Sequence, residues 1–97
     1  MAAYVMAEVN VTNPEGYKEY AALVPETIAK HGGRFLVRGG ASEALEGDWP
    51  KLRRVIIEFP SVESAKRWFA SPEYEKPKAL RRANSEGRLL LMEGFGG

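Results

Sequence analysis

The sequence contains no cysteine, and its 97 residues include a single histidine, His31, and a single aspartate, Asp48. Disulfide bonds and thiolate catalysis are excluded, because both need a cysteine sulfur. A zinc site made by this chain alone is disfavoured, because zinc takes three or four ligands that are mostly Cys and His. An aspartate-based metal site or triad is disfavoured too, since Asp48 lies in a turn without a second aspartate. We expect no metal and no cofactor.

Neither sign of charge is in excess, and no long apolar run is present. Fourteen Lys and Arg residues against thirteen Asp and Glu residues give a net charge of +1. Binding to nucleic acid or to anionic membranes relies on clustered positive charge, so we expect neither partner. No apolar run approaches the roughly 20 residues that span a bilayer, and no signal peptide is evident at the N-terminus. We expect one cytoplasmic domain over residues 1–97.

The spacing of the apolar residues predicts a β-α-β-β-α-β order. A period of two predicts strands, and a period of three to four predicts helices. The strands are expected at residues 3–11, 34–38, 52–59 and 88–95, and the helices at 14–31, 62–70 and 77–83. Residues 42–46 are expected to continue the second strand, and 72–76 to form a short turn. With right-handed crossovers, this is an α+β, ferredoxin-like antiparallel sheet of order 4-1-3-2 with the helices on one face.

The stretch HGGRFLVRGG, residues 31–40, joins the first helix to the second strand. A helix that stops before a strand needs a left-handed residue, so we expect a positive φ at Gly32 or Gly33. Gly39 and Gly40 are expected to interrupt the strand. Neither glycine pair has the following Gly-Lys-Ser/Thr of a phosphate loop.

Several blocks resemble one known family: YVMAEVNVTNPEGYKEY, HGGRFLVRGG, LEGDW, VIIEFPSVESAKRWFASPEYEKPKALR and RLLLMEG. Together they are similar to the family catalogued as domain of unknown function 1330, within the dimeric α/β-barrel superfamily. The resemblance implies a homodimer whose two sheets pack face to face. It implies no established reaction, and the superfamily includes cofactor-free monooxygenases, lactone isomerases and haem-handling proteins.

Alternation divides the strand residues between two faces of the expected sheet. One face is apolar and is expected to lie under the helices: Val5, Ala7, Val9, Val11, Phe35, Val37, Val55, Ile57 and Phe59. The other is mixed: Tyr4, Met6, Glu8, Asn10, Arg34, Leu36, Arg38, Arg54, Ile56, Glu58, Arg88, Leu90 and Met92. A mixed face of this size is not expected to stay in water, so we expect a homodimer that buries it.

The strand directions gather four charged residues of the mixed face near one end: Glu8, Arg38, Arg54 and Arg88. Their excess positive charge indicates a site for a small organic anion, with Arg38 as the clamp and Glu8 and Arg88 beside it. The alternative is structural, because a glutamate on a sheet is often the partner of a neighbouring arginine.

At the opposite end, Arg34 and Glu58 are expected beside His31. This grouping indicates acid/base chemistry, with His31 as the proton-transfer residue and Glu58 as the orienting carboxylate. The alternative is that His31 is a cation at a helix end and Glu58 the partner of an arginine.

Aromatic residues at helical spacing are candidates for either the core or the wall of a pocket. Trp68 and Tyr74 are the candidate ligand-binding residues among them, and Tyr74 is expected to place its hydroxyl in a cleft. Arg81 and Arg82 are interpreted as a solvated helix face.

Three functions are consistent with these patterns. The first is a cofactor-independent enzyme acting on a small organic acid or oxidised aromatic, with His31 as acid/base and Arg38 as anion clamp. The second is a non-catalytic ligand-binding or stress-related module that uses the same arginines. The third is a purely structural dimer.

Overall fold

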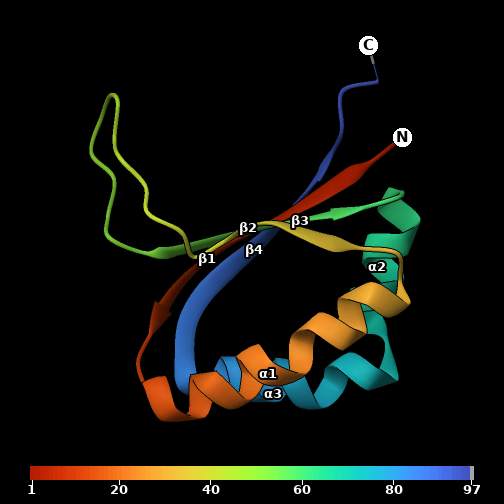
Figure 1. Cartoon of the computed structure of the whole chain (residues 1–97), viewed down its shortest axis with the longest axis horizontal. Coiled ribbons are helices and arrows are strands. Elements are labelled where there is room, and N and C mark those ends of the chain that lie inside the picture. The colour runs from red at the N-terminus through yellow and green to blue at the C-terminus, as the bar shows by residue number, and fades with distance from the viewer. Residues whose placement is uncertain (97) are drawn as a thin grey trace.

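The computed structural model describes residues 1–96 and confirms the ferredoxin-like α+β fold. Its elements are β1 (Ala3–Val11), α1 (Pro14–Lys30), β2 (Arg34–Arg38), β3 (Arg53–Phe59), α2 (Val62–Ala70), α3 (Pro72–Asn84) and β4 (Ser85–Glu93). The strands form one antiparallel sheet of order β2-β3-β1-β4, which is the predicted order read from the other edge. The helices lie together on one side of it (Figure 1). None of the helices in residues 1–96 has the length and hydropathy that a membrane crossing requires.

Local sequence explains how the first two helices begin and how α1 ends. Pro14 is the first residue of α1, where its missing N–H removes no helical bond. Ser61 caps α2, since its Oγ accepts a hydrogen bond from the Ser64 N–H at 3.1 Å. Gly32 follows α1 with a φ of 76°, so the positive φ predicted for this glycine pair is confirmed.

Two predicted boundaries near prolines and glycines are wrong. α3 runs unbroken through Pro77, so residues 72–76 are helix and not a separate turn. A proline disturbs the carbonyl four residues before it, here that of Glu73 in the first turn, and burial of the Pro77 ring offsets that cost. Residues 39–52 are irregular, so residues 42–46 do not continue β2.

The predicted start of the last strand at residue 88 is also wrong, because β4 already begins at Ser85. Gly87 lies opposite Val9 in the ladder between β1 and β4. A Cβ on Gly87 would lie only 2.5 Å from the carbonyl oxygen of Glu8. Glycine is therefore needed at this position for the close approach of the two strands.

The helix side of the sheet holds the hydrophobic core. Trp68, Tyr74 and Phe59 are among its largest fully buried side chains. Trp68 stacks on Tyr74 with 4.3 Å between ring centroids, and its Nε1–H donates to Oγ1 of Thr27 at 3.0 Å. Leu89 packs against this core from β4. The core thus lies where the alternation of β1 and β3 predicted it.

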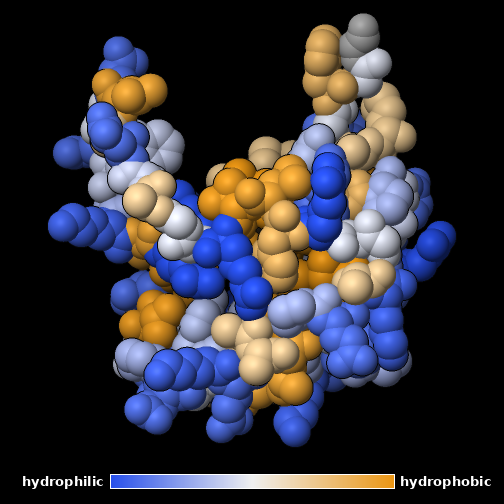
Figure 2. Space-filling view, viewed as in Figure 1, coloured by the Kyte–Doolittle hydropathy of each residue, from blue (hydrophilic) through white to orange (hydrophobic). Residues whose placement is uncertain are grey.

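The opposite side of the sheet, which we call the open face, forms a hollow with apolar side chains on its floor. Residues 39–52 and residues 94–96 rise on either side of it (Figure 1), and Figure 2 shows apolar atoms between these two arms. Leu90 and Met92 of β4 are 54% and 38% exposed, although both are large and apolar. The open face is therefore the one part of the sheet that the described chain leaves uncovered.

Candidate functional site

A β-bulge in β2 decides which side of the sheet its last residues face. Val37 lies opposite Ile56 and Arg38 opposite Val55, with a register shift after Phe35. Cross-strand partners point to the same side of a sheet, so Val37 faces the open face and Arg38 faces the helices. The predictions that Arg38 points to the open face and that Val37 lies under the helices are therefore wrong, because the extra residue of the bulge reverses the alternation.

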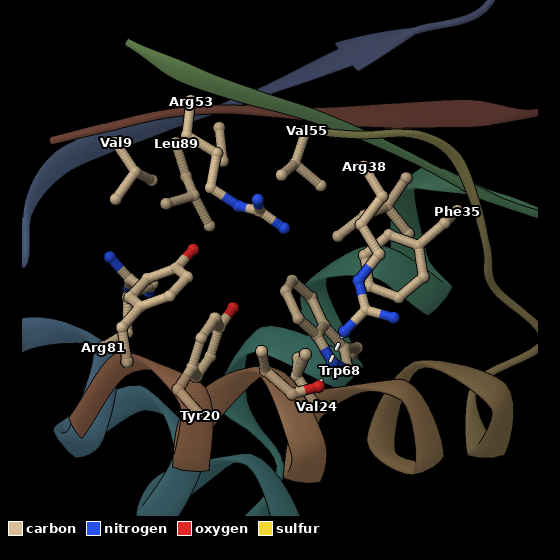
Figure 3. Close-up of a pocket in the computed structure, with 14 residues that line it drawn as sticks. Val9, Tyr20, Val24, Phe35, Arg38, Arg53, Val55, Trp68, Arg81 and Leu89 are labelled. Atoms are coloured by element: carbon tan, nitrogen blue, oxygen red, sulfur yellow. Dashed lines mark hydrogen bonds between the residues drawn. The ribbon is translucent and has the colours of Figure 1, made fainter. Parts of the chain in front are cut away.

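The reversed arginine joins a small cavity between α1 and the sheet, which we call the arginine pocket. Arg53 descends into it from the sheet and Tyr20 rises toward it from α1 (Figure 3). The free volume is about 20 Å³, which has room for one water-sized group. Its lining residues are Ala7, Val9, Tyr17, Tyr20, Ala21, Val24, Phe35, Arg38, Arg53, Val55, Ile57, Trp68, Arg81 and Leu89.

The charges of this pocket are all positive. Arg38, Arg53 and Arg81 line it, whereas no lining side chain is acidic. The Nε atoms of Arg53 and Arg81 are buried and have no hydrogen-bond partner. None of the three arginines forms a salt bridge within residues 1–96. Unpartnered buried groups of this kind lower stability, so the pocket is a place where an anion would be favourable.

Backbone elements fix these guanidinium groups in different ways. Arg53 shares its side of β3 with Val55, so it points under the helices by alternation. Its guanidinium lies 5.7 Å above the Tyr17 ring and packs against Gly39, where a Cβ would collide with Nη1. Arg38 is the exposed arginine of the pocket, so we call its position between β2 and α1 the mouth. It closes this mouth, because its Nη2–H donates to the carbonyl oxygen of Ala21 on α1 at 2.6 Å.

Sequence reasoning missed Arg53 and placed Arg81 wrongly. Alternation with Val55 was the signal that could have found Arg53. Arg81 was interpreted as solvated, but it is only 6% exposed. The signal that could have found it is helical spacing, since Tyr74, Pro77 and Arg81 recur every three to four residues and are all buried.

Tyrosine hydroxyls provide the neutral polar groups beside the pocket. The hydroxyls of Tyr20 and Tyr74 lie 3.3 Å apart. Burial, together with the neighbouring Tyr74, raises the pKa of Tyr20 well above its ordinary value. Tyr20 therefore stays protonated near neutral pH, so it can act there as a hydrogen-bond donor and not as a base. Tyr74 is fully buried, and its hydroxyl meets Tyr20.

On the open face, Glu8 lies between two arginines, as predicted. Its carboxylate accepts hydrogen bonds from Arg54 Nε at 3.0 Å and from Arg88 Nε and Nη2 at 2.9 and 2.8 Å. The hydrogen bonds from Arg88 and then Arg54 hold the pKa of the Glu8 carboxyl below its ordinary value. Both guanidiniums thus already have a carboxylate partner, and the ligand-binding roles of Glu8 and Arg88 stay predictions.

The two predicted catalytic residues have separate partners. Glu58 accepts hydrogen bonds from Arg34 Nε at 2.8 Å and from the Tyr4 hydroxyl at 3.3 Å. His31 Nε2 instead lies 3.0 Å from Oε1 of Glu73, which joins the end of α1 to the start of α3. The Arg34–Glu58 pair was predicted and the His31–Glu73 pair was not. Neither His31 nor Glu58 lines the arginine pocket, and their catalytic roles stay predictions.

Comparisons with known proteins agree with this fold. A family model described as Domain of unknown function (DUF1330) matches residues 2–95. A protein of unknown function from Rhodopseudomonas palustris is similar in structure, with a TM-score of 0.78, 20% identity and coverage of 99% of this chain and 84% of that one. A dimeric ferredoxin-like protein of unknown function from Jannaschia sp. CCS1 has a TM-score of 0.73, 9% identity and coverage of 97% and 100%.

SnoaB, a cofactor-independent oxygenase from Streptomyces nogalater, is also similar, with a TM-score of 0.66, 15% identity and coverage of 99% of this chain and 95% of that one. At these identities the likeness concerns the fold alone. No curated protein matches the sequence. Within residues 1–96, no group of three His, Cys, Asp or Glu side chains could hold a metal ion.

Proposed function

Because the chain belongs to the family described as Domain of unknown function (DUF1330), whose description assigns no activity, we propose its function from its own geometry. The protein binds a small organic anion through the arginine pocket, between α1 and the sheet. The observation that carries this proposal is the pair of buried, unpartnered Nε atoms on Arg53 and Arg81 in a cavity without an acidic lining residue.

A carboxylate is the anion that suits this chemistry. Its oxygens accept several hydrogen bonds, and a guanidinium presents its N–H groups in a plane that matches a carboxylate. A bound carboxylate would give Arg53 and Arg81 the acceptors they lack and would offset their buried charge. The Tyr20 hydroxyl, which burial keeps protonated, is a further donor beside the pocket.

Entry to the pocket requires one side chain to move, since its free volume admits only a water-sized group. Arg38 is exposed and is held by one hydrogen bond to Ala21 and by its position 4.4 Å above the Phe35 ring. Releasing an exposed contact of this kind costs little. Arg38 can therefore leave the mouth and turn toward an incoming anion.

The experiment is a thermal-shift screen of small carboxylates on the wild type, Arg53→Met and a matched control, Arg67→Met. Arg67 is exposed on α2 and forms no salt bridge within the described residues. At least one carboxylate should raise the melting temperature of the wild type and of Arg67→Met but not that of Arg53→Met. Equal stabilisation of all three proteins would reject the proposal.

The proposed functional unit is a homodimer in which a second copy covers the open face. Two observations support it: apolar residues such as Leu90 and Met92 are exposed there, and the arms at residues 39–52 and 94–96 flank the hollow. The Jannaschia relative is described as dimeric. Burial of the face would shield the Glu8 ion pairs from water, which suits charges that already have partners.

Acid/base catalysis is a second candidate function, favoured by the hydrogen bond between His31 and Glu73. A carboxylate that orients an imidazole prepares it for proton transfer. The fold can host chemistry without a cofactor, as SnoaB is a cofactor-independent oxygenase. If this candidate is correct, His31→Ala should abolish conversion of a carboxylate that the pocket binds while leaving its affinity unchanged. Undiminished conversion would remove His31 from the mechanism.

A further inference from the structure

A second and larger cavity adjoins the arginine pocket on the side of the edge strand β4. We call it the α2–β4 groove, and its free volume is about 260 Å³. Its lining is apolar except for Lys66 and consists of Val5, Ala65, Lys66, Trp68, Phe69, Leu89, Leu90 and Leu91. An engineered apolar cavity of about 150 Å³ binds benzene, so this groove has room for an apolar body larger than a benzene ring.

Two residues, Trp68 and Leu89, line both cavities and therefore form the wall between them. Trp68 is held in place, because it is 1% exposed, donates a hydrogen bond to Thr27 and stacks on Tyr74. Leu89 projects from the sheet toward the pocket (Figure 3) and is only partly buried where it packs against the core. Rotation of Leu89 is thus the smallest change that would connect the groove with the arginine pocket.

Building on the function proposed above, we propose that the ligand is an amphipathic carboxylate that occupies both cavities. Its carboxylate lies at Arg53 and Arg81, and its apolar body lies in the α2–β4 groove, with Leu89 turned aside. This arrangement accounts for the difference in size between the cavities, since the charged cavity has room for one water-sized group until Leu89 turns aside, whereas the groove already has room for an apolar body. It also matches the charges, since acidic residues line neither cavity.

Leu89 further connects this region with the solvent. It also lines an open, polar cleft together with Arg81, Arg82 and Arg88, where Glu86 is the one acidic lining residue. The excess of arginines there favours the approach of an anion from this side. Arg81 lines both that cleft and the arginine pocket, so a carboxylate passing Leu89 would stay close to this guanidinium.

The probes are acetate, octanoate and 1-octanol, and the readout is the fluorescence of Trp68 in a Trp49→Phe protein. Trp49 is 60% exposed in the irregular segment, so its removal leaves the buried indole at the shared wall as the reporter. Octanoate should bind about tenfold or more tightly than acetate, since each buried methylene contributes about fourfold. It should also bind about tenfold or more tightly than 1-octanol, which lacks the charge.

Phe69→Ala tests the groove and Phe95→Ala is its matched control. Phe69 lines the groove and is 37% exposed, so its truncation spares the deep core, whereas Phe95 is 99% exposed. Phe69→Ala should weaken octanoate about fivefold or more and leave acetate unchanged, since it removes apolar contact from the tail alone.

The possible failures are distinguishable. If acetate and octanoate bind equally and both need Arg53, the amphipathic ligand is rejected and the anion site stands. If octanoate binds as well to Phe69→Ala as to Phe95→Ala, the groove does not hold the tail and the inference is overturned. If octanoate binds Arg53→Met as tightly as the wild type, or none of the carboxylates binds, the proposed function itself fails.

Discussion

At the scale of single residues, Arg53 and Arg81 are the side chains whose presence is hardest to explain by folding alone. Arg53 lies on the core side of the sheet and Arg81 on the core side of α3. The Nε atom of each is buried and has no hydrogen-bond partner. Positions like these are normally apolar, because a charged group is rarely buried without a partner. A buried charge that lowers the stability of the folded protein is typical of residues that serve in binding.

Replacing Arg53 should therefore stabilise the protein in the absence of ligand. Arg53→Met keeps the length of the apolar stem and removes the unpartnered Nε, so the free energy of unfolding should rise by about 1 kcal/mol. Urea denaturation monitored by circular dichroism measures it. Arg67→Met should lie within about 0.5 kcal/mol of the wild type, as surface changes usually do. A loss of stability in Arg53→Met would mean that the guanidinium has a folding role.

Glu8 gives a prediction for the dependence of stability on pH. The hydrogen bonds from Arg88 and Arg54 hold the folded-state pKa of Glu8 below 4.5, its ordinary value. A lowered pKa contributes stability that is complete above the unfolded-state value and is lost as the pH falls through the folded-state value. The difference in unfolding free energy between wild type and Glu8→Gln should be constant above about pH 5 and shrink below pH 4.5.

Urea denaturation at a series of pH values measures this difference, with Glu63→Gln on the exposed surface of α2 as control. A difference that grows on acidification would contradict the assignment of Glu8 as the acceptor of both arginines.

At the scale of elements, regular alternation in the sequence was enough to predict most of the sheet. β1 and β3 pair without interruption, so their faces follow from the period of two, and Glu8 and Arg54 were predicted to meet on that basis. β2 did not follow the rule, because its bulge after Phe35 depends on how it pairs with β3 and leaves no local signal. That one residue moved Arg38 from the predicted open-face site to the arginine pocket.

The arginine pocket was missed for a related reason. Its lining residues come from all four strands and all three helices, so no single motif contains them. The unbroken α3 was predicted as two pieces, which hid the spacing that buries Arg81. Prolines mark breaks reliably only where packing does not offset their cost, and Pro77 is buried.

Gly87 is the clearest test of packing at this scale. Gly87→Ala places a Cβ against the Glu8 carbonyl oxygen and should lower the free energy of unfolding by about 1–3 kcal/mol. Gly40→Ala is the matched control, since no atom lies within 4 Å of a Cβ at that position. Thermal or urea denaturation compares them, and equal stability of the two variants would show that β1 and β4 separate at little cost.

At the scale of the whole molecule, we assign ligand binding to the helix side of the sheet and dimer formation to the open face. The helix side contains the core and both cavities of the proposed ligand site, whereas the open face exposes apolar residues between two arms. A second copy on the open face would leave the mouth at Arg38 on the other side of the sheet. Dimer formation and ligand binding are therefore expected to be separable.

Met92→Glu tests the dimer, because it places a charge on the open face at a residue that is 38% exposed and lines neither cavity of the proposed ligand site. Leu23→Glu is the matched control, since Leu23 is 40% exposed on α1. Sedimentation velocity should show a dimer for the wild type and Leu23→Glu and a folded monomer for Met92→Glu, because an unpaired charge buried in an interface is strongly unfavourable. A well-folded wild-type monomer at micromolar concentration would reject the dimer.

The central claim, that Arg53 and Arg81 bind an organic anion, is tested most directly by NMR of the arginine Nε–H groups. Titration with octanoate should shift the Nε–H signals of Arg53 and Arg81, since a carboxylate would become their missing hydrogen-bond acceptor. The signal of exposed Arg67 should not move. If the signals of Arg53 and Arg81 stay fixed at saturating octanoate while those of other residues shift, the anion binds elsewhere and the account is contradicted.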